Sequence, residues 1–125
     1  MSLLATFLRA AAAALTPLAN FAGSLAFGSG LVASGSSATK TVTLSNTGTG
    51  TLNIASIAVL PSAGAYALDS TTCGSTLGAG QTCSVVIRFS PTRAKTMYSG
   101  TVTVTDDSNG KAGSKQSLVC SGISA

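Results

Sequence analysis

The sequence contains no histidine, no glutamate and no tryptophan, and these absences restrict the chemistry that the chain can perform. Its acidic side chains are Asp69, Asp106 and Asp107. Hydrolytic catalysis needs a nucleophile with a base in reach, or two carboxylates with well-separated pKa values. Asp106 and Asp107 are adjacent, so their side chains are expected to diverge. We therefore predict that the chain is not an enzyme, with no catalytic residue and no cofactor.

Metal ligands are scarce as well. A zinc site normally uses paired Cys or His ligands, and this chain has three cysteines and no histidine. Residues 106–110, DDSNG, are rich in oxygen ligands, but the spacing and the final glutamate of an EF-hand loop are missing. A turn at Asn109-Gly110 explains this segment better, and we predict no metal site.

Charged and aromatic residues are few, at 8% and 5% of the 125 residues, and the net charge is +4. Nucleic-acid binding favours a dense basic face with aromatic rings for stacking. The positive charge is not spread evenly, because five basic residues fall in one stretch that only Asp106 and Asp107 oppose: Arg88, Arg93, Lys95, Lys111 and Lys115. They are less dense than such a face requires, and with Phe89 expected to point inward, Tyr98 is the only other ring nearby. Positions at strand edges and turns account for them better, so no nucleic-acid partner is predicted.

The residues that dominate instead are serine, threonine, alanine and glycine. A surface of hydroxyls and small side chains suits an extracellular, cell-surface or virion protein that packs against neighbours. The alternative is a neutral surface that only keeps the domain soluble. The length of 125 residues indicates a single domain with a real core.

Alternation with a period of two predicts β-strands. In residues 83–90, Cys83, Val85, Ile87 and Phe89 are apolar, the residues between them are mostly polar, and Val86 is the exception. Several short strands separated by glycine-rich turns indicate an antiparallel sandwich or barrel. The expected strands are Leu25–Phe27, Lys40–Asn46, Leu52–Leu60, Tyr66–Asp69, Thr82–Ser90, Met97–Thr105 and Gln116–Cys120.

The three cysteines suggest one disulfide and one free thiol. Cys73 and Cys83 flank a segment with three glycines, so the chain can double back and join them. This pairing indicates an oxidising compartment. Cys120 shares strand parity with Leu118 and is interpreted as a buried free thiol.

The first 22 residues form a largely apolar segment, in which Pro17 marks the end of the helical pattern. Apolar residues at helical spacing predict a helix over residues 3–15, followed by a sandwich over 23–125. The segment is too short and interrupted to span a membrane. The segment fits a signal peptide cut after Ala19 poorly, because its charge, Arg9, lies in the middle and Pro17 lies close before the cut. An assembly arm that packs on a neighbouring subunit is the preferred hypothesis, through Leu3, Leu4, Phe7, Leu8 and Leu15.

A combination of short motifs resembles the hydin-type (ASH) immunoglobulin-like domains, which include the bacterial choice-of-anchor D modules. The resemblance covers about residues 24–123. Its pieces are Phe27-Gly28, the Ser45-Asn46-Thr47-Gly48 turn, Cys73 to Cys83, Val86 to Thr92, Ser99 to Val104 and Leu118 to Gly122. The resemblance implies an immunoglobulin-like antiparallel sandwich of seven to eight strands with a non-catalytic, protein-binding or structural role.

Members of that family often occur as tandem modules, whereas this sequence holds one copy and an apolar segment. We therefore expect an oligomeric structural or docking subunit on a repetitive surface, such as a phage virion or a bacterial surface structure. Its partner would be itself or a scaffold or capsid subunit. The alternative is a secreted adhesive or carbohydrate-binding module with a cleaved signal peptide. Sugar stacking would depend on Tyr66 and Tyr98.

Overall fold

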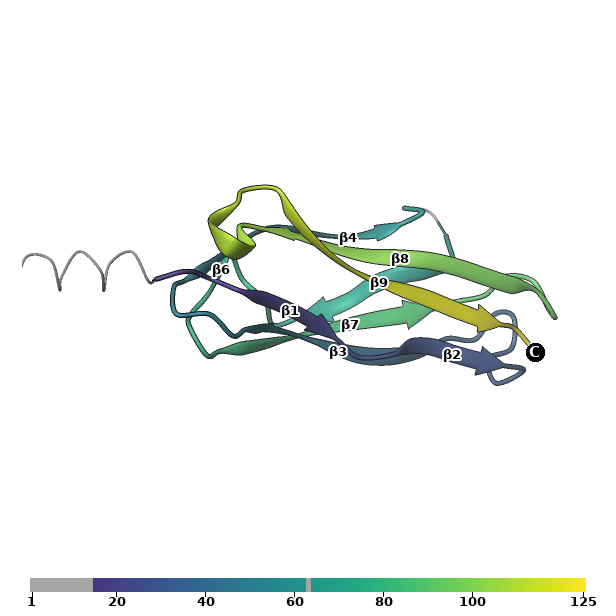
Figure 1. The fold of residues 1–125 in the computed structure, drawn as a ribbon. Coiled ribbons are helices and arrows are strands. Elements are labelled where there is room, and N and C mark those ends of the chain that lie inside the picture. The colour runs from purple at the N-terminus through teal and green to yellow at the C-terminus, as the bar shows by residue number, and fades with distance from the viewer. Residues whose placement is uncertain (1–14, 63) are drawn as a thin grey trace, which may run out of the picture.

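The computed structural model describes residues 15–62 and 64–125, which form two packed β-sheets (Figure 1). This confirms the expected all-β, immunoglobulin-like sandwich. The described residues contain nine strands rather than seven or eight, and one short 3-10 turn. The elements are β1 (Ala19–Ala22), β2 (Leu25–Ser29), β3 (Ala38–Asn46), β4 (Leu52–Leu60), β5 (Tyr66–Thr71), β6 (Thr76–Leu77), β7 (Thr82–Phe89), β8 (Met97–Asp106), η1 (Ser108–Gly110) and β9 (Ser114–Ile123).

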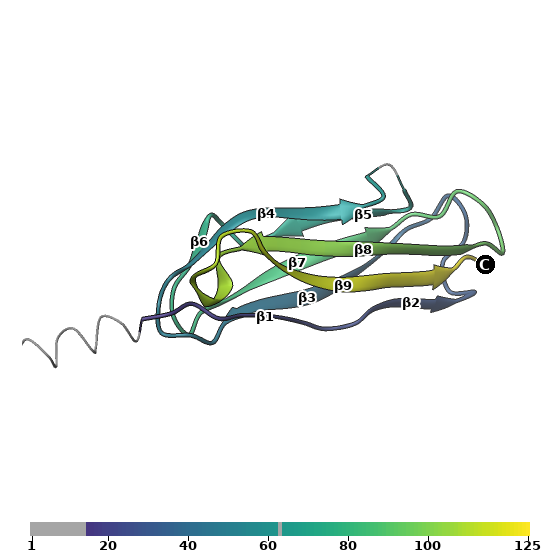
Figure 2. The same cartoon turned by 45° about the horizontal axis from the view of Figure 1, so that its top comes forward.

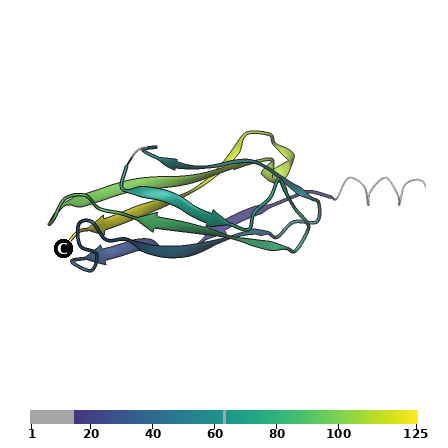
Figure 3. The same cartoon turned by 180° about the vertical axis from the view of Figure 1, so that it is seen from behind.

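One sheet has four strands in the order β1-β3-β7-β5, and the other has five in the order β2-β9-β8-β4-β6. Neighbouring strands are antiparallel, except that β2 runs parallel to β9. Figure 2 shows β4 and β5 side by side along one side of the sandwich, one strand from each sheet. Residue 15 and the C-terminus lie at opposite ends of the domain, as Figure 3 also shows from behind.

The expected domain boundary at residue 22 is wrong. Residues 19–22 form β1, which pairs with β3 in register from Ala19 with Asn46 to Ala22 with Thr43. This strand was missed because it follows an alanine-rich run and contains a single large side chain, Phe21. The expected helix over residues 3–15 lies outside the described residues, except for Leu15, which has no regular secondary structure.

The chain changes sheets between β1 and β2, and a glycine makes this crossing possible. Gly23 has a φ of 136°, and a Cβ placed on it would lie 2.6 Å from Cγ1 of Val42. Any other residue would therefore face both an unfavourable backbone conformation and a clash. The crossing brings β2 alongside β9, where Leu25 is in register with Cys120.

The core follows the alternation seen in the sequence. Val85, Ile87 and Phe89 of β7 are fully buried, and Val86 is half-buried on the opposite face. Phe89 is the centre of an aromatic cluster, with its ring centroid 4.9 Å from that of Tyr66 and 5.3 Å from that of Phe27. Such contacts add to the free energy gained by burying the rings. The aromatic cluster thus joins the two sheets near the end that bears the C-terminus.

Candidate functional site

Asp106 and Asp107, considered above for catalysis and calcium binding, each have a structural role of their own. The Asp106 carboxylate is buried and accepts hydrogen bonds from the Ser108 N–H and the Gln116 side-chain amide. Asp107 accepts bonds from the backbone and the side chain of Asn53, and this hydrogen bonding lowers its pKa. Within residues 15–62 and 64–125, no three His, Cys, Asp or Glu side chains gather as metal ligands would.

The expected turn at Asn109-Gly110 is present in part. Both residues have positive φ angles, of 61° and 73°, as a tight turn requires. The connection between β8 and β9 is longer than a two-residue hairpin, however, and contains η1.

The tyrosines considered for sugar stacking are engaged in the fold. Tyr66 is buried, its hydroxyl donates to the carbonyl of Tyr98, and burial raises its pKa to about 12. Tyr98 packs edge-on against Phe89, and its hydroxyl accepts hydrogen bonds from the backbone N–H groups of Thr92 and Arg93. Hydrogen bonding from Thr92 is the main cause that lowers the pKa of Tyr98. Tyr66 is therefore closed to a sugar, and Tyr98 is half-buried and held in place by the fold.

The cysteines are arranged as the sequence indicated. Cys73 and Cys83 form a disulfide with their Cα atoms 5.0 Å apart, which joins the segment after β5 to the start of β7. Cys120 is unpaired and fully buried, and burial raises the pKa of its thiol to about 11. Disulfide exchange needs an accessible thiolate, and the burial of Cys120 disfavours both access and ionisation near neutral pH.

Reduction of the disulfide is expected to lower the free energy of unfolding by about 2–3 kcal/mol, from the entropy of the short loop that it closes. Urea unfolding with and without a reductant measures this difference. A double variant, Cys73→Ala with Cys83→Ala, should show no response to the reductant. If the reductant lowered the free energy of unfolding equally in wild type and in the double variant, it would be acting on a group other than this disulfide. Peptide mapping without reduction should find Cys73 linked to Cys83.

Residues 16–19 form a junction that binds the N-terminal segment to the sandwich. The carbonyl of Thr16 accepts hydrogen bonds from the N–H groups of Thr49 and Gly50, and the carbonyl of Pro17 accepts one from Asn109. The Ala19 N–H donates to the hydroxyl of Ser108, which is buried. We call residues 16–19 the N-terminal junction. It connects three parts of the chain that are far apart in sequence.

Asn46 is the main side chain of the sandwich that binds this junction. Its side-chain oxygen accepts hydrogen bonds from the N–H groups of Leu18 and Gly48, each 3.1 Å long. Its side-chain nitrogen donates to the carbonyls of Gly50 and Leu77, at 2.7 and 2.9 Å. With 1% of its surface exposed, the amide is buried and fully hydrogen-bonded. The Asn-Thr-Gly motif in the sequence therefore holds residues 16–19 against the sandwich.

The junction packs closely against the turn at residues 46–50, which contains Gly48. A Cβ on Gly48 would lie 2.2 Å from the carbonyl oxygen of Thr16, so no other residue fits without a backbone shift. Leu15, just before the junction, has 63% of its surface exposed, and Leu18 has 43%. The other residues assigned to the arm, Leu3, Leu4, Phe7 and Leu8, lie outside the described residues.

The sheet edges differ in how they are protected against pairing with another chain. Edge strands are commonly blunted by short length, bulges or charges. β1, β2 and β6 are short, and β2 has a register shift. β5 has a register shift around Asp69, whose carboxylate pairs with Arg88 of β7. β4 has a register shift between Ile54 and Ser56, and β6 covers its outer edge only at Leu52 and Asn53. Beyond the shift, Ser56–Leu60 carries no charge and pairs with β8 alone among the described residues, so its outer edge is free.

A groove of about 360 Å³ runs beside this free edge, between β4 and β5. None of the residues that line it carries a charge. They are Ile54, Ala55, Ser56, Ile57, Leu68, Thr71, Cys73, Gly74 and Ser75. Leu68 is 38% exposed and Cys73, half of the disulfide, forms part of the wall. We refer to Ser56–Leu60 together with this groove as the β4 edge groove.

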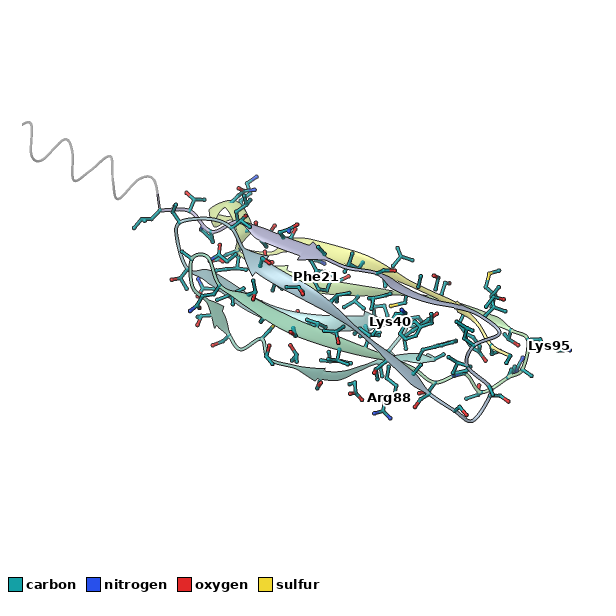
Figure 4. The ribbon with its side chains drawn as sticks, turned by 90° about the horizontal axis from the view of Figure 1, so that it is seen from below. Phe21, Lys40, Arg88 and Lys95 are labelled. Atoms are coloured by element: carbon teal, nitrogen blue, oxygen red, sulfur yellow. A yellow bond between two sulfur atoms is a disulfide. The ribbon has the colours of Figure 1, made fainter. Side chains whose placement is uncertain are left out.

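The basic residues do not form a single face. Arg93 and Lys95 lie between β7 and β8, at one end of the domain, and Lys111 lies in the connection between β8 and β9, at the other. Figure 4 shows Arg88 on the outer side of the sandwich and Lys95 at the end opposite residue 15. The outward positions of β3 and β8 carry threonines, and the hydroxyl of Thr103 lies 3.1 Å from the hydroxyl of Ser117 across the sheet.

These features define an immunoglobulin-like β-sandwich domain with a fixed N-terminal junction and a partly uncovered edge at β4. The chain belongs to the ASH family (Abnormal spindle-like microcephaly-assoc'd, ASPM-SPD-2-Hydin), whose model matches residues 12–113. The match confirms the resemblance seen in the sequence and also covers the N-terminal junction. A search among curated proteins finds no sequence match.

Solved structures share the fold at low sequence identity. The ASH / PapD-like domain of human CEP192 (PapD-like domain 7) is 15% identical with a TM-score of 0.66, and the match covers 88% of this chain and 87% of that one. A protein of unknown function from Porphyromonas gingivalis W83 is 15% identical with a TM-score of 0.69, over 89% of this chain and 48% of that one. The Vibrio cholerae VesB protease is 14% identical with a TM-score of 0.59, over 94% and 34%. This chain thus spans about half or less of the last two proteins.

Proposed function

We propose that the chain is a non-catalytic interaction domain that serves as a structural or docking subunit of a repetitive surface assembly. The observation that carries the proposal is the N-terminal junction, where residues 16–19 are hydrogen-bonded into the sandwich. The apolar residues 1–14 therefore start from a fixed point on the domain. A short apolar segment attached to a rigid point is suited to contact a neighbouring subunit.

Surface composition supports the same role. Threonine and serine occupy much of the outward faces, and the Asp69–Arg88 ion pair is neutral overall. Burying hydroxyls and small residues between subunits costs less than burying unpaired charges. The disulfide is typical of an extracellular, cell-surface or virion location. We propose another copy of the chain, or a scaffold or capsid subunit, as the partner.

The secreted carbohydrate-binding alternative receives less support. In the described part of the chain every aromatic ring is buried or half-buried, so little ring surface is left for stacking on a sugar. A cut after Ala19 would also remove the hydrogen bonds of the N-terminal junction. No helix among the described residues has the length and hydropathy needed to cross a membrane.

The proposal is tested by size-exclusion chromatography with light scattering on the full chain and on a chain that begins at Leu15. We expect the full chain to form oligomers and the shortened chain to be monomeric at the same concentration. The shortened chain keeps the N-terminal junction, so a difference reports on residues 1–14 rather than on unfolding. Two monomers would contradict an assembly role for this segment. Intact-mass measurement on the native protein would show whether the segment is retained.

A further inference from the structure

We propose that residues 1–14 of one copy bind in the β4 edge groove of a second copy. This inference rests on the proposed function and adds to it the receiving surface. The proposal brings together two apolar features: a segment whose partner is not identified, and a strand edge that no described part of the chain covers.

The first argument is the state of the edge. Ser56–Leu60 keep a regular antiparallel register with β8, from Ser56 with Thr105 to Leu60 with Thr101. A regular strand without charges presents backbone N–H and C=O groups that an extended segment can pair with. The other edges of the two sheets are short, shifted in register or charged. Ser56–Leu60, beyond the register shift of β4, is therefore the edge best suited to accept a further strand.

The second argument is the match between the groove and the segment. The groove wall is uncharged and exposes Leu68, while residues 1–14 carry Leu3, Leu4, Phe7 and Leu8 with a single charge at Arg9. An apolar segment gains free energy by leaving water for such a surface, whereas a charged one would lose hydration. The composition of residues 1–14 therefore fits the groove.

The third argument is reach and direction. Fourteen residues span at most about 50 Å when extended, and five residues of strand edge are about 17 Å long. The segment leaves the domain at Leu15, whose backbone lies 3.2 Å from a Cβ built on Gly50. In the same copy, β6 covers Leu52 and Asn53, the part of β4 nearest to this exit, and the Ser75 carbonyl accepts the N–H of Ile54. We propose the groove of a second copy as the receiving surface, because two copies related by a twofold axis can exchange segments reciprocally.

The test uses full-chain variants that block the groove. Gly74 lines it, and a Cβ placed there meets no atom within 4 Å, so Gly74→Arg puts a large charged side chain into the groove without a clash at its base. Ala58→Lys adds a charge to the exposed face of the free edge. Ala94→Arg is the matched control, because it adds the same charge as Gly74→Arg at an exposed site on the other end of the domain. Circular dichroism and thermal unfolding verify that each variant folds.

We expect Gly74→Arg and Ala58→Lys to be monomeric where wild type and Ala94→Arg are oligomeric. A fluorescent peptide of residues 1–14 should bind the chain that begins at Leu15, and Gly74→Arg in that chain should weaken its affinity at least about tenfold. If the full chain assembles and both groove variants assemble equally well, the segment docks elsewhere and only this inference fails.

Two further outcomes are informative. A monomeric wild-type chain would overturn both the inference and the proposed function. Self-association of the chain that begins at Leu15, abolished by Ala58→Lys, would show that the edge pairs with another β4 strand rather than with residues 1–14. That result would overturn the inference as well.

Discussion

A chain that begins at Gly23 is expected to be much less stable than one that begins at Leu15. The shorter chain lacks β1 and the N-terminal junction, so it loses the pairing of β1 with β3 and the half-buried ring of Phe21. It also leaves the Asn46 side-chain oxygen and the Ser108 hydroxyl without the N–H groups of Leu18 and Ala19. Each lost hydrogen bond costs about 1 kcal/mol, more when a buried group stays unpaired.

Together with the lost burial of Phe21, the expected decrease is on the order of 5 kcal/mol, a large share of the stability of a typical domain. Urea unfolding followed by circular dichroism measures it, with the chain that begins at Leu15 as the matched control. Equal unfolding midpoints would mean that β1 is not part of the stable fold. The result also decides which shortened chain suits the assembly test. A chain that begins at Gly23 would fail to assemble through unfolding as well as through the loss of residues 1–14.

The strands of the sandwich were predictable where apolar and polar residues alternate. Leu52–Leu60 is a strand with the predicted bounds, and β7 ends one residue before the predicted end. These segments bury one face and expose the other, so each side chain signals its own environment. The burial of Cys120 followed from its parity with Leu118 for the same reason.

The elements that were missed are stabilised by distant contacts. β1 depends on pairing with β3 and on hydrogen bonds to residues 46–50 and 108–109, which no pattern within residues 19–22 reveals. β6 consists of two residues paired with Leu52 and Asn53, too short for any period to show. Local sequence reports local preference, and tertiary contacts override it where the segment is short.

The candidate site was less predictable than the fold. The apolar character of residues 1–15 was visible in the sequence, but the edge that remains open depends on strand order, which alternation does not specify. The uncharged run Ala55–Leu60 could have drawn attention as a strand without protective residues. Its neighbour across the groove is Leu68 of the other sheet, a juxtaposition that arises only when the two sheets pack.

Replacing Asn46 with alanine is expected to lower the free energy of unfolding by about 3 kcal/mol. The substitution removes the groups that bind the carbonyls of Gly50 and Leu77 and the N–H groups of Leu18 and Gly48. Unpaired polar groups in a buried site cost about 1–3 kcal/mol, and alanine fills only part of the volume. Urea unfolding of the full chain measures the loss. Asn53→Ala, at an exposed site, is the matched control and should cost less than about 1 kcal/mol.

The effect of Asn46→Ala should also depend on the N-terminal junction. Two of the bonded groups, the Leu18 N–H and the Gly50 carbonyl, come from the junction and from the turn that it contacts. In a chain that begins at Gly23, the bond from Leu18 is already absent, so Asn46→Ala should cost less there than in the full chain. Such non-additivity is the signature of residues that act through one network. Equal costs in the two chains would show that Asn46 stabilises its own turn alone, and that the N-terminus is held by its other hydrogen bonds.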